Sequence, residues 1–350
     1  MVDTAAPNTT IGAGPAGSTA STGAIFSFSA DDPAATFECS LDGASFTPCT
    51  SPKSYNGLAE TSHTFSVRAT DLAGNNDQTP ATRTWSVDVT PPAAPAITAP
   101  ANGTAFSTSS VTLSGTAEPG IFVEVFEGST SRGGTTATAG GTWSKTLLLV
   151  ADGPHTYDAT ASDNAGNASP VSNTVTVTVD TTPPNTTISS APATPTNATG
   201  ASFSFSANEA GSSFECQLDD GGYSACASPK SHAGLGDGSH TFLVRAIDAV
   251  GHPDASPASH GWTVDTAAPE TSITSGPADP TVETDAVFVF GANESGSAFE
   301  CSLDGAAFTV CSSPATYLGL NTGAHLFEAR AIDPAGNLDP TPAPYGWTIS

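Results

Sequence analysis

The sequence has few basic residues and no long apolar run. Of its 350 residues only 8 are Lys or Arg, whereas 34 are Asp or Glu, and the formal net charge is -26. A surface this negative repels a phosphate backbone, which excludes nucleic acid as a partner. No run of about 18 apolar residues occurs, so we expect no membrane span in this segment. The N-terminus also lacks the basic and apolar regions of a signal peptide.

Helical patterns are also missing. The chain has one Met and no long Leu/Ala/Lys/Glu pattern, but it has 34 Gly and 28 Pro. Apolar and polar residues alternate instead, as in Phe26 and Phe28, or Phe203 and Phe205, which are separated by Ser. Alternation with a period of two, broken by turn signals roughly every 8 to 12 residues, is typical of short strands with one buried face. The sequence therefore predicts an all-β protein.

One short motif recurs along the chain and divides it into four units. It reads "VDTAAP" at 2–7, "VDVTPP" at 87–92, "VDTTPP" at 179–184 and "VDTAAP" at 264–269. We expect four domains, at 1–88, 89–180, 181–265 and 266–350, and call these units repeats one to four. Repeats one, three and four share the block that begins "FECSLDGASFTPC" in repeat one. Repeat two lacks this block and its cysteines, so it is a divergent subtype.

The segment "IGAGPAG" at 11–17 has the glycine spacing of a dinucleotide-binding turn. The aligned segments "ISSAPAT" at 188–194 and "ITSGPAD" at 273–279 lack at least two of the three glycines. A dinucleotide site also needs a helix after the turn, and too few residues follow before the next strand pattern. We therefore interpret this segment as a loop between the first two strands of a sandwich.

Three segments carry a resemblance to a known family. The linker "VDTTPP", "GTAEPGIFVEVFEG" at 115–128 and "DGPHTYDATASDNAGN" at 152–167 resemble the bacterial immunoglobulin-like repeats of large secreted or surface proteins, including giant adhesins. The resemblance implies four tandem immunoglobulin-like β-sandwich domains in an elongated array, located outside the cell or on its surface. Such modules usually act as spacers, with neighbouring domains of a longer polypeptide or other fibre subunits as their partners.

The six cysteines form pairs, each ten residues apart around an "LDG" or "LDD" turn. The pairs are Cys39 with Cys49, Cys216 with Cys226, and Cys301 with Cys311. Zinc sites prefer closer C-x2-4-C clusters and redox sites a C-x-x-C motif, and neither occurs. The spacing predicts one disulfide across a hairpin in each of these repeats, which places the protein outside a reducing cytoplasm.

Histidine and arginine recur at aligned positions. The histidines are His63, His155, His240 and His325, and their sequence neighbours are Ser, Pro and Ala with no repeated acid beside them. We therefore interpret them as structural residues that bond back to the preceding corner of the sandwich. The arginines Arg68, Arg245 and Arg330 are predicted to form exposed ion pairs with Glu38, Glu215 and Glu300 on the adjacent strand.

Acidic residues recur in the linkers and in two loops of each repeat. These loops and the incoming linker gather at one pole of an immunoglobulin-like sandwich. Converging carboxylates repel one another unless a cation lies between them, and Ca2+ takes six to eight oxygen ligands. The candidate Ca2+ ligands are Asp3, Asp32, Asp71, Asp77, Asp88, Glu118, Asp163, Asp180, Glu209, Asp248, Asp254, Asp265, Glu294, Asp333 and Asp339.

A second interpretation of the acids stays open. The motif "D-x-A-G-N" is also a plain turn, in which Asp accepts backbone hydrogen bonds and Gly takes a positive φ. That interpretation explains the last-loop Asp but not the acids in the linker and the other loop. Asn208 and Asn293 are alternative ligands to the Glu beside them, and repeat two has one loop acid fewer. Calcium at the domain junctions is also what the resemblance to adhesin repeats implies.

Catalytic motifs such as G-x-S-x-G, H-E-x-x-H and the P-loop are absent from the sequence, so we expect a protein that is not an enzyme. Two functions remain. The chain is a structural stalk of an exported bacterial surface protein or fibre, or it is a module that binds a glycan or a partner protein of the host. Repeat two, with "FVEVFEGSTSRGG" at 122–134, is where binding would be sought.

Overall fold

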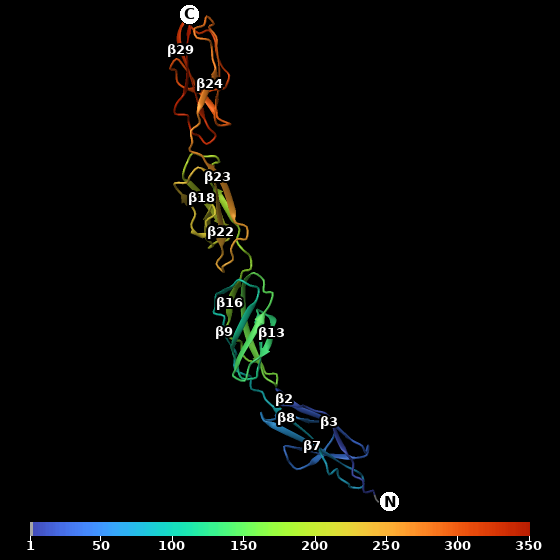
Figure 1. Ribbon diagram of the computed structural model, residues 1–350. Coiled ribbons are helices and arrows are strands. Elements are labelled where there is room, and N and C mark those ends of the chain that lie inside the picture. Colours follow the sequence, from blue (N-terminus) through green and yellow to red (C-terminus); the bar gives the residue numbers. More distant parts are fainter. Residues whose placement is uncertain (1–2) are drawn as a thin grey trace. The chain divides into compact units, whose positions relative to one another are not determined.

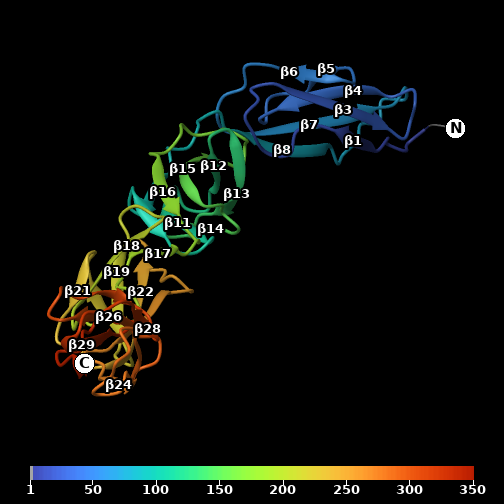
Figure 2. The same ribbon diagram turned by 90° about the horizontal axis from the view of Figure 1, so that it is seen from above.

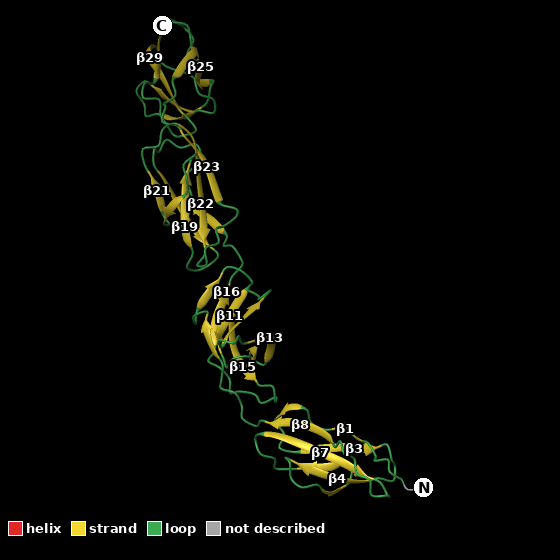
Figure 3. Cartoon of the chain, turned by 60° about the horizontal axis from the view of Figure 1, so that its bottom comes forward, coloured by secondary structure: helices red, strands yellow, loops and turns green. Residues whose placement is uncertain are grey.

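The computed structural model describes residues 3–350, which form strands and loops and no helix (Figure 3). Nothing in these residues is therefore a helix long and apolar enough to cross a membrane. The chain divides into two compact units, Met1–Thr181 and Thr182–Ser350. The first unit contains repeats one and two, and the second contains repeats three and four.

Repeat one consists of two sheets (Figure 2). The first sheet has the order β1 (Thr9–Ala13), β3 (Ala24–Ala30) and β6 (Lys53–Tyr55). The second has the order β2 (Gly17–Thr19), β8 (Ala81–Val87), β7 (Ser62–Thr70), β4 (Thr36–Leu41) and β5 (Thr47–Cys49). Strand β2 runs parallel to β8, while β1 pairs antiparallel with β3. The chain therefore changes sheets between β1 and β2.

The glycine-rich segment lies at this change of sheets. It covers the end of β1 and the start of β2, with a loop between them and no helix after it. A Cβ on Gly14 would lie 2.4 Å from the ring of Phe26, and Gly17 has φ +70°. Both positions need glycine for the local backbone path and packing, which confirms the interpretation as a loop.

Repeat two has the same plan with a longer outer hairpin (Figure 1). Its first sheet has the order β14 (Thr142–Leu147), β11 (Val111–Thr116) and β9 (Ala96–Ala99). The second has the order β10 (Thr104–Phe106), β16 (Val175–Val179), β15 (Gly153–Ser162), β12 (Phe122–Glu127) and β13 (Thr130–Thr136). The hairpin β12–β13 replaces the cysteine-bearing hairpin of repeat one.

The second unit contains two more pairs of sheets. In repeat three these are β17 (Thr186–Ser190), β18 (Ala201–Ala207) and β21 (Lys230–His232), and then β20 (Ser224–Cys226), β19 (Ser213–Leu218), β22 (Gly238–Ile247) and β23 (Ala258–Val264). In repeat four they are β24 (Thr271–Ser275), β25 (Ala286–Ala292) and β28 (Ala315–Tyr317), and then β27 (Thr309–Cys311), β26 (Ala298–Leu303), β29 (Gly323–Ile332) and β30 (Ala343–Ile349).

Each repeat has its own hydrophobic core between its two sheets. In repeat one the fully buried Phe26 of β3 stacks on Phe65 of β7, with 4.1 Å between ring centroids. The equivalent pair in repeat three, Phe203 and Phe242, stacks at 4.0 Å. The period-two alternation produces these faces, and the predicted all-β fold of tandem sandwiches is confirmed. The boundaries of four separately folding domains stay a prediction.

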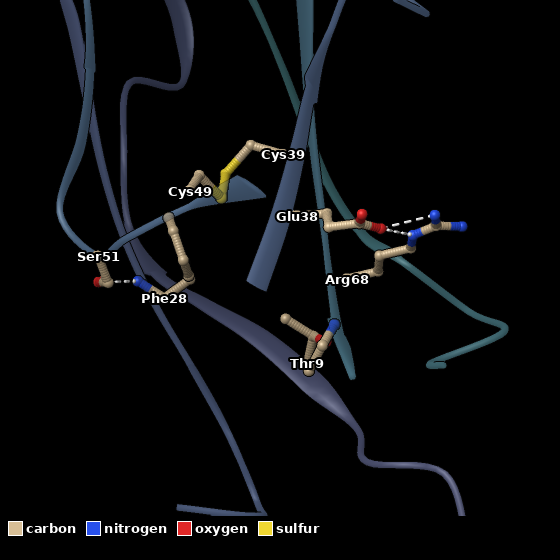
Figure 4. The surroundings of a disulfide bond; sticks show 8 residues. Thr9, Phe28, Glu38, Cys39, Cys49, Ser51 and Arg68 are labelled. Carbon is tan, nitrogen blue, oxygen red and sulfur yellow. Dashed lines mark hydrogen bonds and ion pairs between the residues drawn. A yellow bond between two sulfur atoms is a disulfide. The ribbon is translucent and has the colours of Figure 1, made fainter. Parts of the chain in front are cut away.

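Three disulfides cross the outer hairpins, and no free cysteine occurs in residues 3–350. They join Cys39 to Cys49, Cys216 to Cys226, and Cys301 to Cys311, each with a Cα–Cα distance of 5.8 Å. Figure 4 shows that Cys39 and Glu38 point to opposite sides of β4. Sequence spacing alone therefore identifies all three pairs.

Removing one disulfide should destabilise only its own repeat. We expect the double change Cys216→Ala and Cys226→Ala to lower the free energy of unfolding of repeat three by about 2 to 3 kcal/mol, because an open hairpin has more conformational entropy when unfolded. The chain has four tryptophans, so urea unfolding can be followed by fluorescence in a variant that retains only Trp262. A matched variant that retains only Trp143 of repeat two should show no change, and a loss below about 0.5 kcal/mol in repeat three would contradict the prediction.

Candidate metal-binding site

Three acids of repeat four come together at one end of its sandwich. Asp265 directly follows β23, Asp333 directly follows β29, and Glu294 lies two residues after the end of β25. The carboxyl end of β29 and that of β25 lie at the same pole as the incoming linker. One carboxylate oxygen of each residue lies within 4.8 Å of the others. The predicted meeting of linker and loop acids is therefore present here.

Asp333 is held in place by its own loop. Its Oδ1 accepts hydrogen bonds from the backbone N–H groups of Gly336 at 2.6 Å and Asn337 at 2.8 Å. Its Oδ2 accepts one from the Asn337 side chain at 2.7 Å. Burial raises the pKa of Asp333, but the hydrogen bonds from Asn337 and Gly336 outweigh it and hold this pKa below 3.8. Asp333 is therefore charged and pre-positioned, as the turn interpretation of "D-x-A-G-N" requires.

Glu294 has the opposite electrostatic environment. Burial raises its pKa above 4.5, and the charges of Asp265 and Asp333 raise it further. Its carboxylate accepts no hydrogen bond from residues 3–350, whereas Asp265 accepts one from the backbone N–H of Ala267 at 3.1 Å. Three oxygen donors that repel one another are the arrangement a hard divalent cation would neutralise. These acidic clusters could hold a metal ion.

Repeat three brings two of its predicted ligands together in the same way. Carboxylate oxygens of Glu209 and Asp248 lie within 4.8 Å of each other. Asp248 Oδ1 accepts backbone hydrogen bonds from Val250, Gly251 and His252, and its Oδ2 lies 3.0 Å from His252 Nδ1. The corresponding linker residue, Asp180, belongs to the first unit of the chain.

The acids of repeats one and two are arranged less closely. Asp3, Asp31, Asp32 and Asp71 line a shallow hollow in repeat one. In repeat two, Glu118 instead accepts a hydrogen bond from the backbone N–H of Ala93 at 2.8 Å, and Asp88 accepts one from Thr90 at 3.2 Å. Asp163 binds its own loop through Ala165 and Asn167. Within residues 3–350, the acids of these two repeats form no group of three at ligand distance.

Asp77, Asp254 and Asp339 form hydrogen bonds with the backbone of their own repeats and do not belong to the acidic clusters. They are 4%, 3% and 1% exposed. Their Oδ2 atoms accept hydrogen bonds from the backbone N–H groups of Thr9, Thr186 and Thr271, at 3.0, 2.7 and 2.8 Å. Each carboxylate therefore fastens the first strand of its repeat to the last loop. The threonines at aligned positions in the first strands were the sequence signal that could have indicated these hydrogen bonds. We leave these three acids out of the proposed metal site.

The recurrent histidines do have acidic partners, which corrects the expectation from their sequence neighbours. Their Nδ1 atoms lie 2.8, 2.6, 3.0 and 2.8 Å from carboxylates of Asp42, Glu127, Asp219 and Asp304. These acids lie at the hairpin turn of the adjacent strand, so proximity in sequence could not indicate them. Asp42, Asp219 and Asp304 have positive φ, and the "LD" repeated before each turn was the signal.

The second ring nitrogen of each histidine is also engaged. Nε2 lies 2.8 to 2.9 Å from the carbonyl oxygen four residues earlier, at Ala59, Ala151, Gly236 and Asn321. Hydrogen bonds to these carbonyls, followed by those to the carboxylates, raise the pKa of His63, His240 and His325 above 6.5. Both nitrogens of each ring lie at hydrogen-bond distance from oxygen atoms of the same repeat, which supports a structural role for these histidines. The predicted bond back to the preceding corner is present.

The predicted arginine–glutamate pairs are present and more enclosed than expected. Arg68 Nε and Nη2 lie 2.9 and 2.7 Å from Glu38 Oε2 (Figure 4), and repeats three and four have the same geometry. Both side chains of the Arg68–Glu38 pair are about one third exposed. Each guanidinium also lies over an aromatic ring, at 4.4 Å for Phe46 and 4.1 Å for Tyr223 and Phe308. Sequence analysis missed these aromatic contacts.

Comparison with known proteins identifies one segment directly. The model of the family described as bacterial Ig-like domain matches residues 102–181. The chain is a tandem array of β-sandwich repeats. The matched residues lie almost entirely in repeat two, which is therefore similar to a bacterial Ig-like domain. Over 129 residues the chain is 40% identical to chitinase A1 of Niallia circulans. The matched stretch covers 34% of this chain and 18% of that protein. The chain thus spans less than a fifth of the length of this relative.

Solved structures with tandem sandwiches are similar at low identity. A tetra-tandem repeat from the extending region of a large adhesion protein is 19% identical and covers 99% of this chain and 100% of its own, with a TM-score of 0.34. Fibronectin(III)-like modules of CbhA from Clostridium thermocellum are 19% identical. The match covers 48% of this chain and 92% of that chain, with a TM-score of 0.31. A structure from a 1.5-MDa bacterial ice-binding adhesin is 16% identical. The match covers 75% of this chain and 98% of that chain, with a TM-score of 0.32.

Proposed function

We propose that this chain is a non-enzymatic spacer segment of an exported bacterial protein, in which Ig-like repeats hold another domain away from a cell surface or from a second domain. The observation that supports this proposal is that each linker within a unit forms hydrogen bonds with the repeat before it and with the repeat after it. A spacer needs such hydrogen bonds, because a linker without them is flexible and does not hold the two repeats apart.

The linker between repeats one and two forms hydrogen bonds with both repeats. Glu60 of repeat one accepts hydrogen bonds from the backbone N–H groups of Val89 and Thr90, at 3.2 and 3.0 Å. Asn167 of repeat two donates from Nδ2 to the carbonyl of Asp88 at 2.8 Å. The two repeats also share a backbone hydrogen bond from Ala20 to Ala165 at 3.2 Å. The linker is thus fixed at its N–H and its C=O groups.

The linker between repeats three and four has the same pattern. Asp237 accepts hydrogen bonds from the N–H and hydroxyl of Thr266 at 3.0 and 2.8 Å, and Asn337 donates to the carbonyl of Asp265 at 2.8 Å. The backbone N–H of Asn197 donates to the carbonyl of Ala335 at 3.2 Å. The recurrence of this scheme in both units favours a mechanical function over a single binding site.

Small-angle X-ray scattering tests the spacer function. A compact 350-residue globule would have a radius of gyration of roughly 20 Å. We expect roughly twice this value for the chain, because each repeat has strands of nine or ten residues that span about 30 Å, and the repeats are predicted to follow one another end to end. A compact particle, or a turnover activity in the isolated 350 residues, would rule the function out.

A matched pair of variants tests the hydrogen bonds between Asp237 and the linker. Asp237→Ala removes the hydrogen bonds to Thr266 and should broaden the distribution of interatomic distances in the second unit. Asp285→Ala makes the same change of charge in that unit, but it removes a hydrogen bond to Gly319 at 2.9 Å away from the linker. An equal response of both variants would indicate a general effect of charge.

We further propose that Ca2+ occupies the Asp265, Glu294 and Asp333 cluster and stiffens the linker. Three carboxylates supply hard oxygen donors, and backbone carbonyls and water would complete the six to eight ligands that Ca2+ takes. Asp265 is both a proposed ligand and the residue whose carbonyl Asn337 holds. Bound Ca2+ would therefore connect the linker to two loops of repeat four.

Calcium should raise the stability of repeat four. At a free concentration 100 times its Kd, a ligand of the folded state adds about 2.7 kcal/mol to the free energy of unfolding. We expect a rise in the melting temperature of wild type that EDTA reverses, and a weaker calorimetric binding signal in Glu294→Gln. The control is Glu283→Gln, an exposed acid of the same repeat outside the cluster. Absence of binding heat together with an unchanged melting temperature in EDTA would refute the calcium site.

A further inference from the structure

Repeat two contains a hollow of about 600 Å³ that the spacer function does not require. It lies between the hairpin β12–β13, the end of β14 and the start of β15, all within the first unit. Its volume is in the range of small-ligand pockets. Repeat two is also the repeat without cysteines, so the chain differs most here from its other units.

Positive charge gathers in this pocket. Arg132 and Lys145 are the only Lys or Arg residues in 89–180 of a chain whose net charge is -26, and both line the pocket. A Cβ on Gly133 would lie 3.0 Å from Lys145 Nζ, which places the ammonium group over the hairpin. Two cations in one hollow of so acidic a protein favour an anionic ligand.

The acid in the pocket is already neutralised. Glu127 Oε2 forms an ion pair with Arg132, and its Oε1 lies 2.6 Å from His155 Nδ1. Lys145 forms no ion pair or hydrogen bond through its ammonium group with a residue in 3–350. The pocket therefore keeps the positive charge of Lys145, together with N–H groups of Arg132 that Glu127 does not use.

A tyrosine side chain also lines this pocket. Tyr157 is 1% exposed and lines the pocket, and its hydroxyl hydrogen bonds to no residue in 3–350. The aligned residues Phe65, Phe242 and Phe327 are fully buried and have no hydroxyl. Repeat two therefore has a hydroxyl at a position where the other repeats have none, and this hydroxyl can donate a hydrogen bond to a ligand in the pocket.

The rim of the pocket is apolar and locally strained. Leu148 is 74% exposed and Leu149 is 90% exposed. Leu149 also has φ +57°, a left-handed conformation that an ordinary side chain seldom adopts. Two adjacent exposed leucines, one of them held in a strained conformation, offer an aliphatic contact surface beside the cations.

We propose that this pocket binds a peptide segment of a partner protein through a carboxylate next to an aliphatic side chain. The carboxylate lies between Lys145 and Arg132 and accepts the hydrogen bond of Tyr157, while the aliphatic group packs on Leu148 and Leu149. A sugar ring would need an exposed aromatic platform, and the aromatic ring that lines the pocket, Tyr157, is almost fully buried. Repeat two would thus add partner recognition to the spacer.

Saturation-transfer NMR and calorimetry on the whole chain test this proposal with three small probes. N-acetyl-leucine has the carboxylate and the aliphatic group, N-acetyl-leucinamide lacks the charge, and glucuronate has a carboxylate on a sugar ring. We expect N-acetyl-leucine to bind in the millimolar range and the amide to bind at least about tenfold more weakly, since hydrogen bonds to charged groups are the stronger ones. Preferential binding of glucuronate would overturn the peptide class, and no binding of any probe would overturn the site.

Three variants locate the binding. Tyr157→Phe restores the residue of the other repeats, and Leu149→Gly suits the positive φ, so both should retain the fold as judged by circular dichroism. Each should weaken binding of N-acetyl-leucine several-fold, and Lys145→Gln should weaken it roughly tenfold. Lys53→Gln in repeat one makes the same charge change elsewhere and should leave the affinity unchanged. Equal affinity in all four variants would place the binding outside this pocket and overturn the proposal.

Discussion

Replacing Asp339 with alanine is expected to lower the free energy of unfolding of repeat four by about 3 to 4 kcal/mol, because it leaves buried hydrogen-bond donors without partners. Asp339 is 1% exposed and accepts hydrogen bonds from the backbone N–H groups of Thr271 and Thr341, both at 2.8 Å. The Thr271 hydroxyl in turn accepts a hydrogen bond from the N–H of Ala331. One carboxylate thus connects the first strand, the last loop and β29.

The effect of Asp339→Ala should not depend on calcium but should depend on pH. Burial raises the pKa of Asp339, but hydrogen bonds from Thr271 and Thr341 outweigh it and hold this pKa below 3.8. A lowered pKa stabilises the folded state above the unfolded value, and this contribution is lost as pH falls through the folded value. Urea unfolding with and without EDTA, between pH 7 and pH 3, measures both dependences. A loss of stability that occurs only with Ca2+ present would return Asp339 to the metal site.

Replacing Phe327 with alanine is expected to cost about 3 to 5 kcal/mol, because a large side chain leaves a cavity in a core that collapses only partly. Phe327 is fully buried and stacks on Phe288 with 4.0 Å between ring centroids. Trp347 lies 5.2 Å from Phe288, so its fluorescence reports unfolding of this core. Phe327→Leu, which retains most of the volume, should cost clearly less. Equal losses in both variants would mean that packing volume does not determine the stability of this core.

Local patterns were sufficient for the fold and the disulfides. Alternation of Phe26 and Phe28 with serine determines which face of β3 is buried, because successive side chains of a strand point to opposite sides. The separation of Cys39 and Cys49 by ten residues around a turn leaves a cross-hairpin disulfide as the simple solution. Recurrence of these patterns at nearly constant intervals also indicates tandem sandwiches. Each of these features depends on residues close in sequence.

The candidate metal site was predictable only in part. The sequence indicates that Asp265, Glu294 and Asp333 follow strands that end at one pole, and the structure places one oxygen of each within 4.8 Å of the others. It does not indicate that Asp339, six residues after Asp333, turns into the core toward Thr271. Both aspartates belong to the same loop, and only the path of the backbone separates a surface carboxylate from a buried one.

The sequence by itself determined the all-β class, the repeat pattern, the disulfide pairs and the arginine–glutamate pairs, because strand periodicity, short hairpins and cross-strand alignment follow from local geometry. Tertiary structure decided the partners of groups that are distant in sequence. It brought Asp42 to His63, Glu60 to the linker at Thr90, and the Tyr157 hydroxyl to a pocket with Lys145. Such contacts depend on how strands and loops pack in three dimensions, and residue spacing along the chain does not encode that packing directly.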